Sequence, residues 1–469
     1  MERKREMAEA AKVVDEGRIQ GNLEAGRGKS REEVLACLKK AGEAKGLEPE
    51  EAAALLQVED PDLQGEVFRA ARGVKMKIYG KRLVLFAPLY LSNTCVNNCR
   101  YCGFRRDNRS IPRKRLSPEE IRNQVQQLEN LGHKRLLIEC GESSLSDMDY
   151  VEEAIATIYG TRSGRGEIRR VNVNIAATTV DHYRRLKAAR IGTYQLFQET
   201  YHRATYEALH EGPKRDYERQ ILALDRAQEA GIDDVGLGVL FGLYDHKFEV
   251  LALLYHARHL EETFGVGPHT ISVPRFRPAP GVDFRLPHPV SDEEFKKLIA
   301  VLRLSVPYTG MIISTRESAE LRAEAFSLGI SQTSAGSRTS PGGYGARGGE
   351  EGEVSAQFQI ADHRSPDEVI RSICELGYLP SFCTACYRRG RTGKGFMEMA
   401  KPGDIQHLCG PNAVLTFKEY LLDYATEETR RVGEETLAHH MEDISSPGLK
   451  EKTQGRIQEM EKGKRDLYF

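Results

Sequence analysis

The chain has 469 residues, of which 40% are hydrophobic and 29% are charged, a composition typical of a globular protein with a sizeable core. Its formal net charge is −1 and no basic stripe is present, which argues against a nucleic-acid partner. The charged start of the chain lacks the apolar core of a signal peptide, and no apolar run is long enough to span a bilayer. We therefore expect a cytoplasmic protein that does not act at a membrane.

Residues 1–80 carry many charges and two clear helix-start signals. Ser30 and Glu33 form a capping box, and Pro49 stands in the first turn of a second helical pattern. We predict that these residues form a helical N-terminal extension that packs on the main body of the protein.

From residue 83 onward, apolar strand patterns alternate with helical patterns. The predicted strands cover residues 83–86, 136–138, 171–175, 193–197, 235–241, 270–273, 311–313 and 330–335. Strand–helix units in this number, closing on themselves, make an α/β fold of the TIM type, a (β/α)8 barrel, which we expect over residues 81–379. An open doubly wound sheet is the alternative arrangement for the same alternation.

Two regions lie outside the repeating pattern. A glycine-rich insertion, residues 341–353, separates the eighth strand from its helix. It lacks the G-x4-G-K-[ST] pattern of a phosphate loop, so we predict a mobile cover and not a nucleotide cradle. Residues 380–469 contain a second group of cysteines, and we expect them to form a C-terminal auxiliary cluster domain.

The chain has nine cysteines, an odd number that does not favour a disulfide framework in a reducing compartment. Cys95, Cys99 and Cys102 have C-x3-C-x2-C spacing directly after the first strand, and therefore at the mouth where barrel active sites lie. Cubane 4Fe-4S clusters normally take four cysteines, so three thiolates leave one iron open. The alternative is half of a structural zinc site, for which the last two cysteines have suitable spacing.

Cys383, Cys386 and Cys409 form a second set of three, with C-x2-C-x22-C spacing. They follow the last barrel helix, and helices return to the opposite mouth, so we expect this set at the other end of the barrel. His269 immediately precedes the sixth strand and belongs to the same end, where a metal-ligand role competes with a structural one. A four-cysteine zinc ribbon joining the two C-x2-C pairs is the alternative, and their separation along the chain argues against it.

Polar residues follow several predicted strands on the active-site side. Glu199 ends the fourth strand, where a carboxylate suits a site for cationic groups, and Arg219 in the next helix is a candidate clamp for a carboxylate. Arg316 follows the seventh strand and is a natural anchor for an amino-acid carboxylate, with hydroxyl contacts from Ser314 and Ser334. A solvated surface charge is the alternative role for Glu199 and for Arg219.

The first cysteine motif resembles that of the radical S-adenosylmethionine (SAM) superfamily, both in spacing and in the aromatic Tyr101 before the last cysteine. The resemblance implies that the open iron holds SAM through its amino and carboxylate groups. Enzymes of this superfamily carry Gly-Gly-Glu after the second strand, where backbone carbonyls accept from the methionine ammonium. Cys140, Gly141 and Glu142 stand there in this chain. Cys140 replaces the first glycine, and we expect it to pack there and not to bind iron.

Residues 198–201, 314–317 and 334–344 resemble the tyrosine lyases of this superfamily, and the second cysteine set resembles the branch that matures FeFe-hydrogenases. The resemblance implies that a 5′-deoxyadenosyl radical starts cleavage of the Cα–Cβ bond of L-tyrosine into p-cresol and dehydroglycine. Dehydroglycine would then cross the barrel interior to a second 4Fe-4S cluster. There it would give carbon monoxide and cyanide on an extra iron, held by His269 and a bridging cysteine, as a synthon for the hydrogenase H-cluster.

The same resemblance implies four partners: L-tyrosine, free cysteine, a reductant such as ferredoxin or flavodoxin, and other hydrogenase maturation proteins. A tyrosine lyase of thiazole biosynthesis is the nearest alternative function, and the second cysteine set argues against it. An iron–sulfur carrier without turnover and a zinc-stabilised barrel are alternatives of other classes.

Overall fold

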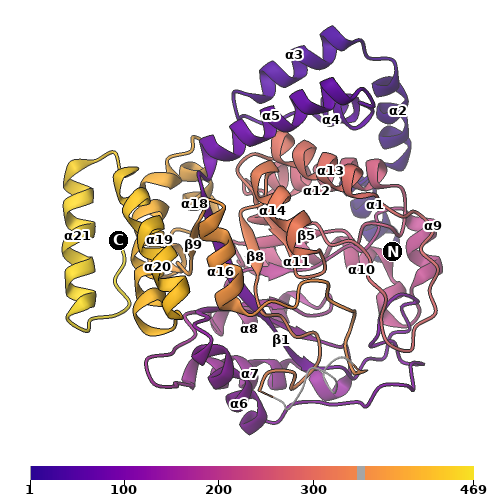
Figure 1. The fold of residues 1–469 in the computed structure, drawn as a ribbon. Coiled ribbons are helices and arrows are strands. Elements are labelled where there is room, and N and C mark those ends of the chain that lie inside the picture. Colours follow the sequence, from indigo (N-terminus) through magenta and orange to yellow (C-terminus); the bar gives the residue numbers. More distant parts are fainter. Residues whose placement is uncertain (1, 346–353) are drawn as a thin grey trace.

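The computed structural model describes residues 2–345 and 354–469 of the chain. Its N-terminal part consists of α1 (Glu2–Val13), α2 (Glu16–Arg27), α3 (Arg31–Ala41), α4 (Pro49–Leu56) and α5 (Pro61–Ile78). The capping box of Ser30 and Glu33 begins α3, and Pro49 is the first residue of α4, as predicted. These helices pack against the outer helices of the main body, and α2 to α5 form the arm at the top of Figure 1.

Parallel strands close into a barrel in the described part of the chain. They are β1 (Arg82–Ser92), β2 (Arg135–Cys140), β3 (Arg170–Asn174), β4 (Tyr194–Gln195), β5 (Val235–Gly238), β6 (Thr270–Ser272), β7 (Gly310–Ile313) and β8 (Gln332–Ser334). Each strand pairs with the next, and β8 pairs with β1. The (β/α)8 prediction is therefore confirmed, and the open doubly wound sheet is wrong because such a sheet would leave β1 and β8 apart.

Helices surround the barrel and connect its strands. They are α6 (Pro118–Asn130), α7 (Met148–Gly160), α8 (Val180–Ala188), α9 (Arg203–Leu209), α10 (Tyr217–Ile221), α11 (Ala223–Glu229), α12 (His246–Phe264), α13 (Asp292–Ser305), α14 (Ala319–Leu328) and α16 (Pro366–Glu375). The continuous core lies between these helices and the outward-facing residues of the strands. Helix α6 begins with the capping box of Ser117 and Glu120 that its sequence predicts.

Strand β1 runs the length of the barrel and has two distinct faces. Its residues at positions 83, 85, 87, 89 and 91 join the core beneath the helices. Residues at positions 82 and 84 line a cavity at the start of the strand, and those at 86, 88 and 90 line another toward its end. Because side chains alternate along a strand, one continuous element forms a wall of both cavities.

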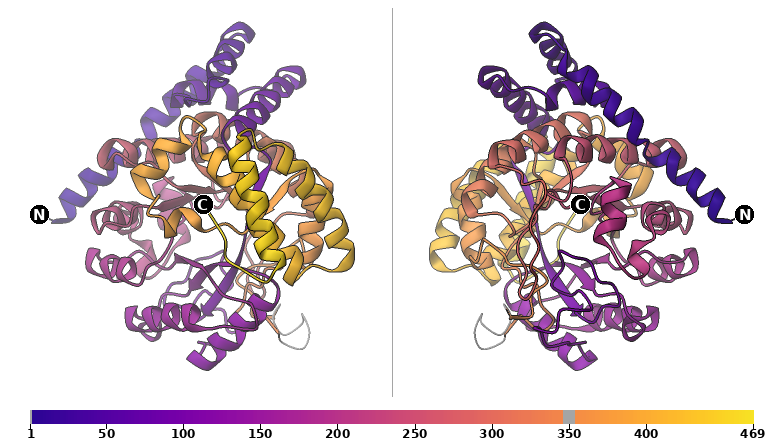
Figure 2. Two further views of the ribbon diagram at one scale, coloured as in Figure 1. Left: turned by 90° about the vertical axis from the view of Figure 1, so that its left-hand side faces the viewer. Right: turned by 90° about the vertical axis from the view of Figure 1, so that its right-hand side faces the viewer.

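The C-terminal part covers the end of the barrel where β1 starts (Figures 1 and 2). It contains β9 (Leu379–Ser381), α17 (Ala385–Arg388), α18 (Gly393–Ala400), α19 (Ile405–Asp423), α20 (Glu427–Glu442) and α21 (Pro447–Glu461). Strand β9 pairs in parallel with the first residues of β1, outside the closed ring. The sequence analysis did not predict β9, since it has three residues and contains Pro380, which edge positions tolerate.

The structure leaves two further predictions open, the domain boundaries and the glycine-rich cover. The domain boundaries after residues 80 and 379 stay predictions, and β9 spans the second of them. Most of the predicted cover, residues 346–353, lies outside the described residues. The first part of the predicted cover, residues 341–345, is anchored, because the Tyr344 hydroxyl donates to the Pro88 carbonyl at 2.7 Å.

Across residues 2–345 and 354–469, no helix has the length and apolar character needed to cross a membrane.

Candidate functional site

The larger cavity, called here the upper cavity, opens at the carboxyl ends of the barrel strands. The loop after β1 brings all three cysteines of the first set, Cys95, Cys99 and Cys102, to its wall. Burial raises the pKa of the Cys102 thiol to about 11 and also raises the pKa of Cys99. Thiolates at this site therefore need a cation to stabilise them, which a metal cluster provides on binding.

The backbone of the cysteine loop is tied to the end of β2. The Val96 amide donates to the Glu142 carbonyl at 2.7 Å, and the Asn97 amide group donates to the Glu142 carboxylate at 2.7 Å. A side chain at Gly141 would come within 2.4 Å of the Thr94 carbonyl, so this close approach requires glycine. The segment predicted to contact SAM thus also supports the cysteine loop.

Cys140, Glu142 and Arg219 lie near one another at this end of the barrel. Cys140 lines the cavity with Gly141 and Glu142, and burial raises the pKa of its thiol to about 12. The Arg219 guanidinium donates to the Glu142 carboxylate at 2.6 Å and to the Ala177 carbonyl. Cys140 and Glu142 therefore line the cavity, whereas Arg219 is not among its lining residues and contacts Glu142, with part of its donor set engaged by protein acceptors.

Glu199 and Lys214 form an ion pair in the wall of the upper cavity. The Lys214 ammonium donates to the Glu199 carboxylate at 2.6 Å. Glu199 adopts a left-handed backbone conformation with φ of 69°, which costs energy for a residue with a side chain. Burial lowers the pKa of Lys214, but Glu199 and the Cys99 thiol more than offset this and raise it overall. The sequence analysis found Glu199 and missed Lys214, which places a positive charge beside the cysteine loop.

Tyr101 is held by a histidine that the sequence analysis also missed. The Tyr101 hydroxyl lies 2.7 Å from His210 Nε2, and His210 Nδ1 lies 2.7 Å from the Tyr206 carbonyl. Burial lowers the pKa of His210 to about 3, so the ring is neutral. A carbonyl only accepts, which places the ring hydrogen on Nδ1 and makes Nε2 the acceptor of the Tyr101 hydroxyl. This chain of hydrogen bonds fixes the Tyr101 ring.

Arg316, Ser314 and Ser334 stand at the ends of β7 and β8, on the same cavity wall. The Arg316 guanidinium lies 3.2 Å from the centre of the Phe358 ring. Ser334 Oγ accepts from the Thr315 amide at 3.2 Å and from the Ser337 hydroxyl at 3.1 Å, so it also braces the loop after β7.

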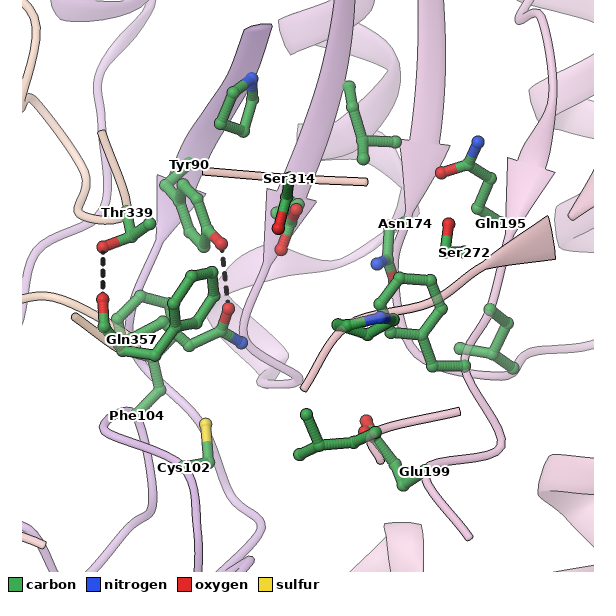
Figure 3. A pocket seen from close by; sticks show the side chains of 18 of the residues that line it. Tyr90, Cys102, Phe104, Asn174, Gln195, Glu199, Ser272, Ser314, Thr339 and Gln357 are labelled. Carbon is green, nitrogen blue, oxygen red and sulfur yellow. Dashed lines mark hydrogen bonds between the residues drawn. The ribbon is translucent and has the colours of Figure 1, made fainter. Parts of the chain in front are cut away.

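A strap of residues 355–359 crosses the upper cavity. Figure 3 shows the hydrogen bond that the Tyr90 hydroxyl donates to Gln357 Oε1 at 2.9 Å, near Cys102 and Phe104. The Gly103 amide donates to the Gln357 carbonyl at 3.0 Å, and a side chain at Gly103 would come within 2.4 Å of the Ala356 carbonyl. The strap therefore packs directly on the cysteine loop and forms part of the cavity wall.

The second cavity, called here the lower pocket, contains the other predicted metal ligands. Cys383, Cys386, Cys409 and His269 line it together, although they come from four separate places in the chain. Cys383 follows β9, Cys386 lies in α17, Cys409 lies in α19, and His269 precedes β6. The Cys386 thiol donates a hydrogen bond that lowers the pKa of Cys409.

His269 is buried and has no short hydrogen bond among the described residues. Its Nε2 is 3.4 Å from the Tyr387 hydroxyl, its Nδ1 is 3.5 Å from Asp234 Oδ1, and its ring packs on Phe396. Burial lowers its pKa, so the ring is neutral, the form that binds metals. A neutral imidazole with a poorly engaged nitrogen beside three thiols fits a metal ligand.

Arginines surround the lower pocket. Arg82 and Arg135 both line it, and the Arg135 guanidinium donates to the Cys383 carbonyl at 2.9 Å while its Nε has no partner among the described residues. Burial lowers the pKa of Arg82, but the nearby thiols of Cys409 and Cys383 raise it overall. These arginines thus give the lower pocket positive charge that would stabilise a negatively charged group.

The two cavities lie at opposite ends of the barrel. The residues of β1 that separate them, with a rise of about 3.3 Å each, keep the two cysteine sets well apart. A zinc ribbon shared between the C-x2-C pairs is therefore wrong for this chain. Within the described residues, no three histidine, cysteine or carboxylate side chains converge as ligands of a single metal ion. A cluster, in which each thiolate binds its own iron, does not require such convergence.

Comparisons with known proteins agree with this geometry. The radical SAM superfamily model matches residues 89–254, and the biotin and thiamin synthesis associated domain matches residues 272–379. A 2-iminoacetate synthase of Salmonella typhimurium is 31% identical over 352 residues, covering 74% of this chain and 90% of its own. A crystal structure of HydG, a maturase of the [FeFe]-hydrogenase, is 56% identical over 98% of this chain and 100% of its own, with a TM-score of 0.95.

The chain belongs to the HydG maturases of the radical SAM superfamily. A second HydG structure, from Carboxydothermus hydrogenoformans, is 40% identical over 96% of this chain, with a TM-score of 0.83. The HydG similarity thus spans nearly the whole chain, whereas the 2-iminoacetate synthase leaves about a quarter of it unmatched. This chain is a radical SAM lyase, and its family implies SAM and a 4Fe-4S cluster. The three thiols of the upper cavity, beside a half-buried lysine, fit that cluster.

Proposed function

We propose that this protein cleaves the Cα–Cβ bond of L-tyrosine to p-cresol and dehydroglycine and converts dehydroglycine into carbon monoxide and cyanide for the FeFe-hydrogenase H-cluster. The observation that carries the proposal is the pair of three-cysteine cavities at opposite ends of one barrel. A tyrosine lyase alone needs only the upper cavity. The lower pocket, with three thiols and His269, supplies a place for the second step.

The upper cavity positions the first step. SAM bound to the cluster of Cys95, Cys99 and Cys102 supplies the 5′-deoxyadenosyl radical. Tyr101, Glu199 and Arg219, with the backbone of residues 140–142, hold SAM in this proposal. Arg316 holds the tyrosine carboxylate, with Ser314 and Ser334 beside it. The strap over the cavity keeps water from the radical, which would otherwise be lost to side reactions.

The lower pocket handles the second step. The dehydroglycine anion has the atoms of one cyanide ion, one carbon monoxide and one water, so its breakdown needs no outside oxidant or reductant. Cys383, Cys386 and Cys409 would hold a second 4Fe-4S cluster, and His269 an extra iron bridged to it by a free cysteine. Arg82 and Arg135 give the pocket the positive charge that an anion arriving there requires.

Inward-facing residues of several strands lie between the two cavities. Successive inward positions of β1, β2, β7 and β8 line the lower pocket and then the upper cavity: Val84 and Phe86, Arg135 and Leu137, Gly310 and Ile312, Gln332 and Ser334. The interior between them is partly polar, since the Gln195 amide group donates to the Thr270 hydroxyl at 3.3 Å. This supports a path for dehydroglycine through the barrel.

Further partners follow from the proposed chemistry. L-tyrosine and free cysteine are the small-molecule partners, a ferredoxin or flavodoxin would reduce the upper cluster, and other maturation proteins would receive the product. Product analysis under anaerobic conditions, with tyrosine, cysteine, SAM and a reductant, tests the proposal. We expect p-cresol, cyanide and carbon monoxide. Release of p-cresol and dehydroglycine (2-iminoacetate) without cyanide would contradict the proposal and favour a tyrosine lyase of thiazole biosynthesis.

Replacing Cys386 separates the two steps. Cys386→Ala is expected to preserve p-cresol formation and to abolish carbon monoxide, because Cys386 lies only in the lower pocket. Cys374→Ala is the matched control, since Cys374 is also buried but lies in α16, away from both cavities. Loss of p-cresol in Cys386→Ala, with Cys374→Ala unaffected, would contradict the division of labour.

A further inference from the structure

Glu139 is a carboxylate of the upper cavity that the roles assigned above do not use. It is an inward-facing residue near the end of β2 and lines the cavity. In the sheet it pairs with Tyr90 of β1 on one side and Asn174 of β3 on the other. Strand pairing fixes its backbone on both sides, so its side chain is a rigidly mounted part of the substrate wall.

The other two carboxylates of this cavity already have cationic partners. Glu199 is paired with Lys214 at 2.6 Å, and Glu142 with Arg219 at 2.6 Å. Glu139 makes no ion pair among the residues that the structure describes. It is therefore the carboxylate that remains available to a positive group on a ligand.

The surroundings of Glu139 make its protonation sensitive near neutral pH. The titratable and charged groups that face it are Tyr90 on β1, Arg316 after β7, Glu199 after β4 and Tyr344 after β8. Burial raises the pKa of Glu139 to about 7, while Tyr90 and Arg316 act in the opposite direction. A group of this kind takes up and gives back a proton at small cost.

The chemistry of the substrate points to the same residue. An amino acid carries its ammonium group on the same carbon as its carboxylate, so a carboxylate held on Arg316 keeps the ammonium within the same small region. Arg316 and Glu139 are close enough to influence each other electrostatically. Abstracting hydrogen from an ammonium would leave a cationic nitrogen radical in a buried site, whereas a neutral amine gives a neutral radical and avoids that desolvated charge.

We propose that Glu139 is the general base that takes a proton from the α-ammonium group of bound tyrosine before hydrogen abstraction. In this step an N–H bond of the ammonium breaks and an O–H bond of the carboxyl forms, giving a neutral amine and a neutral acid with no transfer of electrons. The inference rests on the proposed tyrosine lyase activity and adds to it the residue that prepares the nitrogen.

The test measures p-cresol formation at saturating tyrosine and SAM, between about pH 6 and pH 9, for the wild-type enzyme, Glu139→Gln and Glu139→Asp. Glu320→Gln is the matched control, an identical change on the exposed face of α14. The electron paramagnetic resonance signal of the reduced cluster with and without SAM is recorded for each variant. Wild-type p-cresol formation establishes the lyase activity, so its absence would refute the proposed function and not this inference alone.

We expect the wild-type rate to fall as pH drops through the pKa of Glu139, because the base is then protonated. Glu139→Gln should keep the SAM-dependent signal, lose at least about 100-fold in rate near pH 7, and recover part of it at high pH, where the amine loses its proton without help. Glu139→Asp should retain more activity than Glu139→Gln. A Glu139→Gln rate near that of the wild type, or an equal loss at every pH, would overturn the inference. If Glu139→Gln loses its cluster, a wild-type rate that does not change with pH across this range would overturn it.

Discussion

The two cysteine cavities show two different ways to bring three thiols together. The upper one takes its three thiols from eight consecutive residues, 95–102, on one loop, and that loop is held by the strap and by the end of β2. The lower one takes its ligands from four places between residues 269 and 409, brought together by the barrel, β9, α17 and α19. The upper site is therefore a local motif, whereas the lower site exists only in the folded chain.

The charges around the two sites also differ. Lys214 beside the upper thiols is already neutralised by Glu199. Arg82 and Arg135 line the lower pocket, and one nitrogen of Arg135 has no partner within the described residues. This contrast fits the proposed roles, in which the upper cavity binds a sulfonium cofactor and the lower pocket takes up an anion. The predictions below test this contrast, from the largest expected effect to the smallest.

Removing an upper thiol should stop both steps. Cys99→Ala is expected to abolish p-cresol, cyanide and carbon monoxide together, because in the proposed mechanism the upper cavity makes the dehydroglycine that the lower pocket consumes. Product analysis by chromatography and a haemoglobin assay for carbon monoxide measure the effect. Adding dehydroglycine from outside should restore some carbon monoxide, and its failure to do so in the presence of an intact lower cluster would weaken the idea of separate sites.

Removing the lower histidine should affect only the second step. His269→Ala is expected to leave the rate of p-cresol formation unchanged and to reduce carbon monoxide per p-cresol by about 10- to 100-fold, the usual cost of weakening a metal site. The ratio of the two products is the measurement. His439→Ala, an exposed histidine of α20, is the control. A parallel loss of p-cresol would show that His269 acts on the barrel as a whole.

Removing the support of Tyr101 should have the smallest effect. His210→Ala is expected to weaken SAM binding by about tenfold, because a buried hydrogen bond to the Tyr101 hydroxyl is lost while the ring itself remains. The pKa of His210 is about 3, so its ring stays neutral between about pH 6 and pH 8, and its protonation should not change the affinity for SAM over this range. Titration followed by cluster spectroscopy measures it. An unchanged affinity would mean that Tyr101 does not need this support.

The barrel and the two cysteine sets can be predicted from the sequence, whereas several residues around the cavities and one strand cannot, for physical reasons. Cysteine spacing and strand alternation are local patterns, so the barrel and both thiol sets were predictable. His210 directly follows α9, Lys214 lies in a 3-10 helix of residues 213–215 and Glu139 lies in β2, and nothing local distinguishes these single residues from structural positions. Glu139 left one signal, a carboxylate directly after three apolar strand residues, at an inward position. Strand β9 left none, because three residues show no periodicity.

Strand β1 has a mechanical consequence. Because a single unbroken run of backbone contributes to both cavities, neither can swing away from the other without tearing the hydrogen-bonded ladder between β1 and its neighbours β2 and β8. A one-residue insertion midway along β1 would turn every side chain beyond it to the opposite face, and would spoil one cavity while sparing the other. If dehydroglycine crosses the barrel as proposed, the distance that it travels is therefore fixed by this architecture, with no joint along which it can vary.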